Sequence, residues 1–372
     1  MEKISHSIKL FFTKIKAFFT STAFLKKYDK TMKILKKVIP MIIIYALLIC
    51  FSYVFMYPIL KMVVDSFKSE SDLMNPDIVW LPRNLTLSNY KNAAAAMFVF
   101  RPIYTFAGAK SGLYGIQSTL WNSALYSFLT ACCQTLIAGL AGYAFARFNF
   151  RWKKFWFAGL IISFVVPIQI LVLPRKIMMN PIINFFSTPA RIFGLTGSSM
   201  ESFINANLNI LQTTPMIIIS ILGQGVNSAI LVFIFFSFFK MIPSALDEAA
   251  EIGGANYRQI FYHVIIKMSI PTILVVFLFS FVWNWNDTFV IGQMTLLTGD
   301  KKEAFLSMPS ALGTFNYVIS QGTATSGTDS EGNNRGWRAA AMVISILPLV
   351  ILYAFTQRKF VEGIENTGVT GI

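Results

Sequence analysis

Hydrophobic residues lie along this chain in long unbroken runs rather than in alternating positions. Each of the longest runs could cross a hydrocarbon core of about 30 Å as a helix. Continuous runs favour helices over the strands of a barrel, whose lipid-facing residues alternate with polar ones. The pattern therefore predicts an all-α integral membrane protein. Its six expected transmembrane helices are Val38–Leu60, Trp121–Ala146, Phe155–Leu173, Met216–Phe239, Ile270–Ile291 and Ala339–Phe355.

The composition supports this class of protein. Hydrophobic residues make up 55% of the 372 residues and charged residues 13%, about half the charged fraction of an average soluble domain. The mean hydropathy is +0.59. The cysteines Cys50, Cys132 and Cys133 form neither a CxxC pair nor a Cys/His cluster, so we interpret them as small buried hydrophobic residues.

The basic residues predict the orientation in the membrane. Lysines crowd the segment from Lys3 to Lys37, and further Lys and Arg residues occupy 147–154 and 358–359. Short connections rich in Lys and Arg stay in the cytoplasm, so both termini are expected there. The net charge of +15 then reflects topology, with anionic lipid as the partner and no nucleic acid. The long connections expected outside are Lys61–Leu120, Pro174–Pro215 and Gly292–Arg338.

These features divide the chain into four parts. Residues 1–37 form a basic cytoplasmic segment, in which apolar residues recur at helical spacing between Ile8 and Phe19. We interpret it as an amphipathic helix in the headgroup layer, and a disordered basic tail is the alternative. Residues 38–117 hold the first span and a long outer loop. Residues 118–357 hold the other five spans and a cytoplasmic loop at 241–271, and residues 358–372 form a cytoplasmic tail.

The sequence contains no recognisable catalytic or metal-binding motif. Walker, HExxH and GxSxG motifs are absent, and the two histidines, His6 and His263, lie outside the predicted spans. Gly327 and Gly332 have P-loop spacing, but Asn333-Asn334 follows where Lys and Ser or Thr are required. The segment Thr323–Trp337 is therefore expected to be a flexible loop. The chain is predicted to be neither an enzyme nor a carrier of its own cofactor or metal.

The loop at 241–271 contains the capping and helix-breaking residues expected of two short helices. Ser244 is expected to be an N-cap, with Asp247 bonding back to it, for a helix that runs to Ile252. Gly253-Gly254 should break this helix because glycine adopts backbone angles that other residues resist. Asn256 with Gln259 offers a second cap. The first helix has a small apolar surface formed by Leu246, Ala249, Ala250 and Ile252.

Such a helical turn suits docking in a groove of another protein. An interfacial hairpin without a partner fits the pattern equally well. The choice between them comes from a resemblance. Glu248-Ala249-Ala250-x3-Gly254-Ala255, followed by Pro271, resembles the signature cytoplasmic loop of binding-protein-dependent ABC permeases.

Three further stretches resemble the carbohydrate-uptake branch of that family, in particular the second permease subunit of the maltose type. They are Ala141–Phe148, Trp285-Asn286-Asp287, and Gln357–Ile364 with Gly368-Val369. The resemblance covers Asn122 to Gly371. Two positions depart from the family's loop, since Gly253 replaces the usual acidic residue and Lys267 the usual proline.

The resemblance implies a type I ABC importer permease fold in the bacterial cytoplasmic membrane. In such importers the loop enters a cleft of a cytoplasmic ABC ATPase dimer, which binds ATP and Mg²⁺. A homologous second permease completes a heterodimer, and an extracytoplasmic solute-binding protein delivers the sugar, here expected to be an oligosaccharide. The residues implied to couple to the ATPase are Glu248, Ala249, Ala250, Gly254 and Ala255.

Polar residues in membrane spans are functional candidates because burying them in lipid is costly. Their indole, amide and carboxylate groups could line a sugar pathway. The alternative for each is an interfacial belt or a bond between helices, which is the commoner role for any one of them. The other permease subunit of maltose-type importers can also make most of the sugar contacts. The candidates are Asn284, Trp285, Asp287, Gln169 and Asn227, with Gln224 beside Asn227.

Other transporters fit less well. A polyol phosphate or a peptide is the alternative substrate for an ABC permease. An ion-coupled secondary transporter would need buried acids along a path and inverted repeats. Only Asp287 meets the first requirement, and no repeat is visible.

Overall fold

The computed structural model describes residues 22–97, 99, 118–186, 213–295, 307–323 and 331–368. These segments are helical or lie in turns, and one isolated bridge pairs Lys68 with Leu85. The chain divides into two compact units, Met1–Val64 and Asp65–Ile372. The described part is all-α, as the apolar runs predicted.

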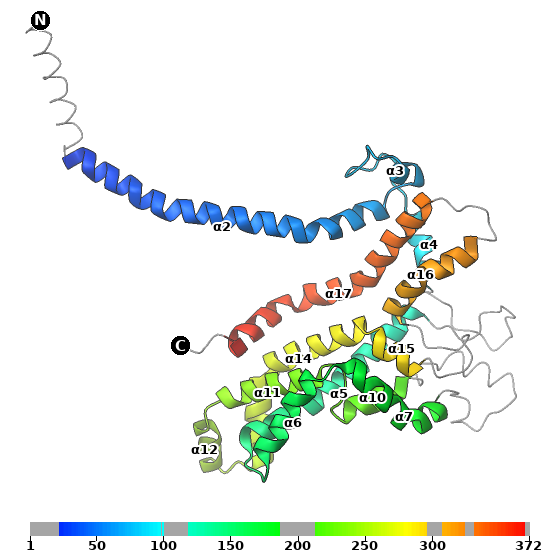
Figure 1. The fold of residues 1–372 in the computed structure, drawn as a ribbon. Helices are drawn as coiled ribbons and strands as arrows, with labels where there is room; N and C mark the ends of the chain where they lie inside the picture. The colour runs from blue at the N-terminus through cyan, green and yellow to red at the C-terminus, as the bar shows by residue number, and fades with distance from the viewer. Residues whose placement is uncertain are drawn as a thin grey trace, which may run out of the picture. The chain divides into compact units, whose positions relative to one another are not determined.

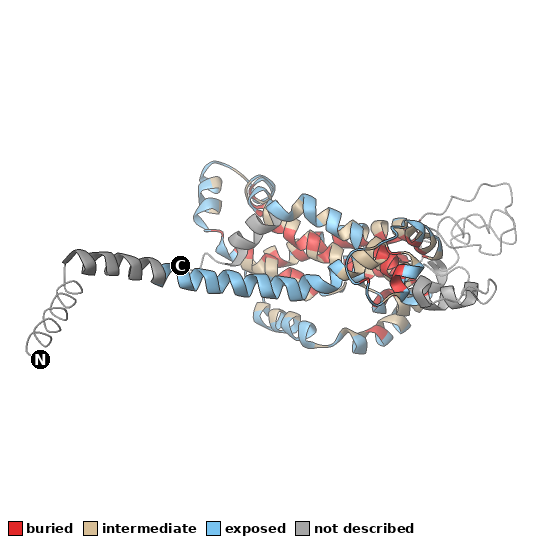
Figure 2. Cartoon of the chain, turned by 90° about the horizontal axis from the view of Figure 1, so that it is seen from above, coloured by how far each residue is buried: buried red, intermediate tan, exposed pale blue. Residues whose placement is uncertain are grey.

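The first unit consists of most of α2 (Thr22–Ser66). Its first predicted span is confirmed as one apolar helix, and every residue from Val38 to Leu60 is exposed (Figure 2). This surface requires lipid or protein around it. The amphipathic segment predicted between Ile8 and Phe19 lies outside the described residues.

The described helices provide four to six candidate membrane spans. Two pairs of helices, α6 with α7 and α11 with α12, become single spans only if each bend is counted within the membrane. The four that are long and apolar enough by themselves are Lys36–Ser66, Thr119–Arg147, Tyr257–Asn286 and Arg335–Arg358.

The third predicted span, Phe155–Leu173, is not a continuous helix. It is divided into α6 (Lys153–Val165) and α7 (Ile168–Phe186), with a bend of 105° between them. Pro167 lies at the bend. Proline has no N–H, and it disfavours helical angles in the residue before it. Val166 accordingly has an extended backbone, with φ −70° and ψ 120°.

The fourth predicted span, Met216–Phe239, is also broken. α10 (Thr214–Ile221) and α11 (Ser228–Met241) are separated by residues 222–227. Gly223 and Asn227 have φ values of 75° and 52° there, which end the regular helix. The prediction of one continuous helix over this range is therefore wrong.

The core of the second unit lies where α5 (Thr119–Arg147) packs against α11 and α14 (Ile266–Asn286) (Figures 1 and 2). Small residues allow this close packing. A Cβ atom added at Gly142 would lie 2.5 Å from the Cβ atom of Phe235 on α11. A second contact joins α14 to α17 (Glu331–Gly368).

The segment after α2 was predicted to be a loop, but it is folded as far as Met97. It contains α3 (Glu70–Met74) and α4 (Ser88–Ala96), and both pack against α17. Lys68 is buried, pairs with Asp65 at 2.8 Å, and donates to the carbonyl oxygens of Ile78 and Val79 at 2.9 and 2.8 Å. These bonds satisfy a charge that would otherwise be costly to bury.

The elements predicted to lie on opposite sides of the membrane lie at opposite ends of the second unit. Figure 1 places α12 (Ala245–Ile252) and the start of α6 at one end. It places α15 (Phe289–Thr295), α16 (Met308–Thr323), α3 and α4 at the other. The C-terminal part of α17 runs toward the end that holds α12. This alternation is the one expected from the basic flanks.

Two predicted irregular segments are partly helical. α16 continues to Thr323 and α17 begins at Glu331, so the flexible loop predicted over Thr323–Trp337 is wrong for its last seven residues. α17 also continues through residues 358–368 of the predicted tail.

We predict that Gly142→Ala destabilises the protein, because the added methyl group overlaps Phe235 and the backbone nitrogen of Phe236. Overpacking of this kind costs about 1–3 kcal/mol. Gly139→Ala is the matched control, since its methyl group would meet the Phe235 ring at an ordinary 3.6 Å. The measurement is thermal unfolding of the purified protein in detergent. Equal melting temperatures for the two variants would contradict the close α5–α11 contact.

Candidate functional site

The predicted docking helix, α12, lies at an exposed end of the second unit. None of its residues is buried. Glu248, Ala249 and Gly254 are exposed, whereas Ala250 and Ala255 are half-buried and pack against a hydrophobic cluster to which α11 and residues 260–265 contribute most. The five residues implied to couple to the ATPase thus lie together. Three are open to a partner and two rest on the membrane helices.

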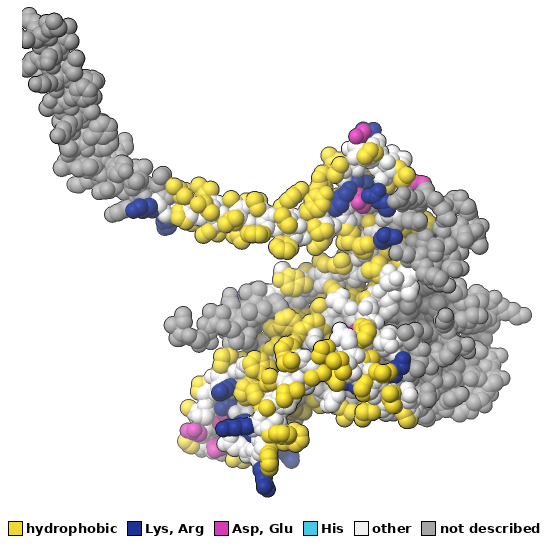
Figure 3. All heavy atoms as spheres, in the orientation of Figure 1, with side chains coloured by type: hydrophobic (Ala, Val, Ile, Leu, Met, Phe, Trp, Pro, Cys, Tyr) yellow, Lys and Arg dark blue, Asp and Glu magenta, His cyan; other side chains and the backbone are white. Residues whose placement is uncertain are grey.

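Charged side chains surround this end of the unit. Figure 3 shows Lys and Arg side chains around α12 and the start of α6, next to the acidic side chains of α12. Hydrophobic side chains cover the helices beyond them. The polar surface therefore ends close to α12, as expected of an element just outside the membrane.

The start of α12 differs from the prediction. Ser244 has helical backbone angles, φ −64° and ψ −25°, and its side chain makes no capping bond. The expected Ser244 cap is therefore wrong. Asp247 is turned away from it toward α5, where its Oδ2 atom lies 3.4 Å from Nη1 of Arg147. A tertiary ion pair has replaced the local capping interaction.

The break and the second cap are as predicted. Gly254 has φ +82°, a conformation that side-chain-bearing residues rarely adopt. Asn256 and Gln259 form a capping box, in which each side chain accepts a hydrogen bond from the other residue's backbone N–H, at 2.9 and 2.8 Å. This box begins α13 (Tyr257–Gln259).

A π-helix that the sequence did not predict follows at Ile260–Ile265 and continues into α14. π-Helical turns are rare and often lie at functional sites. Beside this turn is an open depression of about 350 Å³, lined by Gly253, Gly254, Ala255, Gln259, Ile260, His263 and Val264. It could receive side chains of a partner docked on α12.

Arg147 is a site residue that sequence reasoning missed. It ends α5, and its Nη2 atom donates to the carbonyl oxygen of Ile242 at 2.8 Å while Nη1 faces Asp247. The Nε atom of Arg147 and the Oδ1 atom of Asp247 are buried without a hydrogen-bond partner among the described residues. Both residues lay in or beside family motifs, but their separation of 100 positions concealed the contact.

A second polar group lies deep between α5 and α14. The side-chain amide of Asn284 donates to Ser280 O at 2.7 Å and to Gln134 Oε1 at 3.2 Å, and the Ser280 hydroxyl also donates to Gln134 Oε1. Asn284 and Gln134 are each 2% exposed. A Cβ atom at Gly225 would overlap the Gln134 amide, so the α10–α11 break lies directly on this group.

The other candidates for the sugar pathway are dispersed. Trp285 is 2% exposed, packs among residues of α4, α16 and α17, and stacks on Phe281. Asp287 accepts hydrogen bonds from the N–H groups of Val290 and Ile291, at 3.0 and 3.2 Å, at the start of α15. Gln169 and Asn227 are exposed at the start of α7 and at the α10–α11 break.

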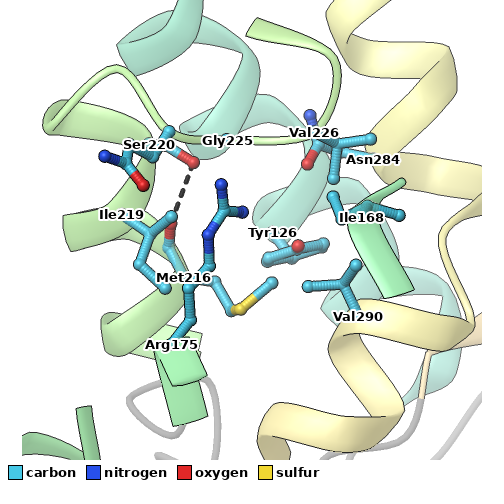
Figure 4. A pocket seen from close by; sticks show the side chains of 11 residues that line it. Tyr126, Ile168, Arg175, Met216, Ile219, Ser220, Gly225, Val226, Asn284 and Val290 are labelled. Atoms are coloured by element: carbon cyan, nitrogen blue, oxygen red, sulfur yellow. Dashed lines mark hydrogen bonds between the residues drawn. The ribbon is translucent and has the colours of Figure 1, made fainter. Parts of the chain in front are cut away.

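A small cavity of about 10 Å³ adjoins the polar group (Figure 4). Its walls come from α5, α7, α10, the 222–227 break, α14 and α15. This volume holds about one water molecule, so no sugar ring fits in the present conformation. Its polar lining residues are Tyr126, Arg175, Ser220, Gln224 and Asn284.

Residues 134–366 match the family described as the binding-protein-dependent transport system inner membrane component. This chain belongs to that family. The match runs from Gln134 through the 241–271 loop and α14 into α17. It therefore includes the Arg147–Asp247 pair and the group formed by Gln134, Ser280 and Asn284. It places the chain among multi-pass membrane proteins.

Curated relatives extend the similarity over most of the chain. The arabinooligosaccharides transport system permease protein AraQ of Halalkalibacterium halodurans is 25% identical over 322 residues, 86% of this chain and 93% of the relative. The multiple sugar-binding transport system permease protein MsmG of Streptococcus mutans is 25% identical over 332 residues, 87% and 95%. The sn-glycerol-3-phosphate transport system permease protein UgpE of Yersinia pestis is 24% identical over 260 residues, 70% and 76%.

A solved structure has the same fold. It is the crystal structure of a bacterial ABC transporter involved in the import of the acidic polysaccharide alginate. The TM-score is 0.54 at 18% identity, over 87% of this chain and 98% of that one. The helix arrangement of this chain therefore resembles that of the matched chain.

We predict that Arg147→Gln loosens the start of the 241–271 loop, because the loop loses its bonds to the end of α5. Loss of a charge-assisted bond of about 1.5–2 kcal/mol should raise tryptic cleavage at Arg258 roughly ten- to thirtyfold. Arg151→Gln is the control, since it removes an arginine from the exposed connection before α6. The measurement is the rate of fragment formation in limited proteolysis. Equal cleavage rates in the two variants would show that Arg147 does not hold the loop.

Proposed function

We propose that this chain is the permease subunit of an ATP-driven, binding-protein-dependent importer that moves a sugar across the bacterial cytoplasmic membrane. The observation that carries the proposal is the exposed α12–Gly254 turn, which a membrane-embedded helical unit holds at one end. Its family membership, and relatives named for oligosaccharide and sugar transport, support the same function.

Coupling to a cytoplasmic ABC ATPase passes through this turn. Glu248, Ala249 and Gly254 offer a narrow exposed edge that enters the ATPase groove, and the adjoining depression receives groups from its rim. Ala250 and Ala255 bear on the membrane helices. ATP and Mg²⁺ belong to the ATPase, and this chain contributes no catalytic group.

A displacement of α12 by the ATPase is transmitted to the transport pathway through two structural connections. Arg147 connects the loop to α5, and the π-helix continues into α14. These two helices hold the group formed by Gln134, Ser280 and Asn284. ATP binding therefore favours one of two arrangements of α5, α14 and the 222–227 break, and a shift between them opens the pathway.

The orientation follows from the basic flanks. We place α12, the α5–α6 connection and both termini in the cytoplasm. With α12 outside the membrane, the count of six spans takes α6 with α7 as one span and α10 with α11, in place of α11 with α12, as another. The opposite end, with α3, α4 and α16, then faces the solute-binding protein. A homologous second permease covers exposed apolar helices and completes the pore as a heterodimer.

The transported solute is a sugar, for which we favour an oligosaccharide. A polyol phosphate remains the alternative, because one relative is named for sn-glycerol-3-phosphate transport. Asn284 lines the small cavity and is the pathway candidate that the geometry supports best. Trp285 and Asp287 act through packing and capping beside it, and Gln169 and Asn227 lie at the flanking helix breaks.

We expect Glu248→Arg and Ala249→Trp to abolish uptake without preventing membrane insertion, because both side chains are exposed outside the apolar helices. The measurement is co-purification with the ATPase, together with ATP hydrolysis stimulated by the loaded binding protein. A loss of roughly tenfold or more in the stimulated rate corresponds to at least about 1.4 kcal/mol of activation free energy. Normal stimulation in both variants would refute coupling through α12.

Gly254→Ala and Gly253→Ala form a matched pair. The methyl group has open space at Gly254, but φ of +82° strains any side-chain-bearing residue there, whereas Gly253 has an ordinary φ of −71°. We expect the first variant to reduce stimulated ATP hydrolysis and the second to leave it nearly unchanged. Equal activity of the two would show that the shape of the turn does not matter for coupling.

Orientation can be tested at two equally exposed positions. Leu81 is 86% exposed in the segment after α2, and Ile252 is 89% exposed at the end of α12. In a cysteine-free background, we expect Leu81→Cys to react with a membrane-impermeant thiol reagent in spheroplasts and Ile252→Cys to react only after permeabilisation. The reverse pattern would invert the proposed topology.

A further inference from the structure

The small cavity lies where the helices of the second unit are interrupted. α7 reaches it after the Pro167 bend, and the 222–227 break closes another side. Interrupted helices within membrane proteins are tolerated where they line a cavity, and such places form binding sites in many transporters. The helix interruptions alone therefore make this cavity a candidate binding site.

Arg175 is the one charged residue that lines the cavity. It is half-buried, and Figure 4 shows its guanidinium group extending from α7 into the space between Ser220 and Tyr126. It forms no hydrogen bond or ion pair with another described residue. A cation in this position is costly to keep without a partner and is a functional candidate by default.

No described acidic residue lines the cavity to neutralise this charge. Ser220 already donates its hydroxyl hydrogen to Met216 O at 2.8 Å, as the dashed line in Figure 4 shows. Asn284 is held by Ser280 and Gln134, and Gln224 is neutral. The carboxylate of Asp287 accepts hydrogen bonds from the backbone at the start of α15 and does not line the cavity. The cavity thus presents a positive charge and neutral polar groups.

We infer that this cavity is a subsite for a negatively charged substituent of the transported sugar, with Arg175 as its ion-pairing residue. The substituent is an oxyanion, either the carboxylate of a uronic acid or a phosphate ester. A guanidinium group pairs with either through two parallel N–H···O bonds. This inference rests on the proposed transport function and makes its substrate class more specific.

The present volume indicates when the sugar can enter. A cavity of about one water molecule admits the substituent only after its walls separate. The wall best suited to move is the 222–227 segment, where Gly223 and Asn227 have left-handed angles and Gly225 rests on the Gln134 amide. The same conformational change that opens the pathway therefore uncovers Arg175.

The test uses the purified transporter complex and three probes that share a hexose ring. D-Glucuronate and D-glucose 6-phosphate carry the charge, and D-glucuronamide is the neutral counterpart of the first. The melting temperature is followed against probe concentration at constant ionic strength, because a ligand that binds the folded state raises it. At least one anion should stabilise the complex at a concentration where the amide does not, and comparing the two anions distinguishes a carboxylate from a phosphate substituent.

Arg175→Gln should weaken anion binding about ten- to hundredfold, as expected for a charge-assisted hydrogen bond. Lys176→Gln is the matched control, because it removes the adjacent charge, which does not line the cavity. It should bind like the unmodified protein. The unliganded Arg175→Gln complex should melt at the same or a higher temperature, whereas a lower melting temperature would indicate a structural role and contradict the inference.

Three other results would overturn it: equal stabilisation by glucuronate and its amide, unchanged anion binding in Arg175→Gln, or no stabilisation by either anion. Failure of the proposed function is distinguished in the same preparation. If the loaded binding protein stimulates ATP hydrolysis while no anion binds, only the Arg175 inference fails. If stimulation is absent from the unmodified complex, the transport proposal fails first.

Discussion

The packing of α5 against α11 and α14 is the contact on which the rest of the second unit depends. Small residues permit it, since a side chain at Gly142 would enter Phe235. Along its length α5 then makes polar attachments to several other elements. Arg147 bonds the 241–271 loop, Gln134 bonds Ser280 and Asn284, and Ser123 accepts a hydrogen bond from Met308 N at 2.6 Å. Lipid offers no partner to such groups, so each attachment must be made within protein.

This arrangement explains how a chain without a nucleotide-binding motif can take part in ATP-driven transport. The 241–271 loop contains a capping box and a glycine break, and a hydrogen bond from Arg147 to Ile242 O holds its start. It bears on the same helices that hold the buried polar group and the cavity. A closely packed unit does not absorb such a displacement locally, and it shifts between discrete arrangements instead.

Sequence reasoning succeeded where local signals were strong. Continuous apolar runs located the membrane helices, and Asn256 with Gln259 formed the predicted capping box. It failed where tertiary contacts competed with local ones. Ser244 has helical backbone angles and makes no capping bond, and Asp247 pairs instead with Arg147, a residue 100 positions away. The segment after α2 has the composition of a loop, yet burial of Lys68 and packing on α17 give it a fixed fold.

By itself the sequence determined the helical class, the candidate spans, the basic flanks and the break in the 241–271 loop, because these depend on hydrophobicity, charge and glycine geometry within short windows. The tertiary structure decided that the third and fourth spans are interrupted and that α5 and α14 share a polar group. It also decided that Arg175 enters a cavity. Those outcomes depend on which distant side chains share a buried space, and no local pattern encodes that. The five candidate pathway residues illustrate the limit. All five are polar or aromatic residues of predicted spans, but only packing separated Asn284 at the cavity from Trp285 in the core.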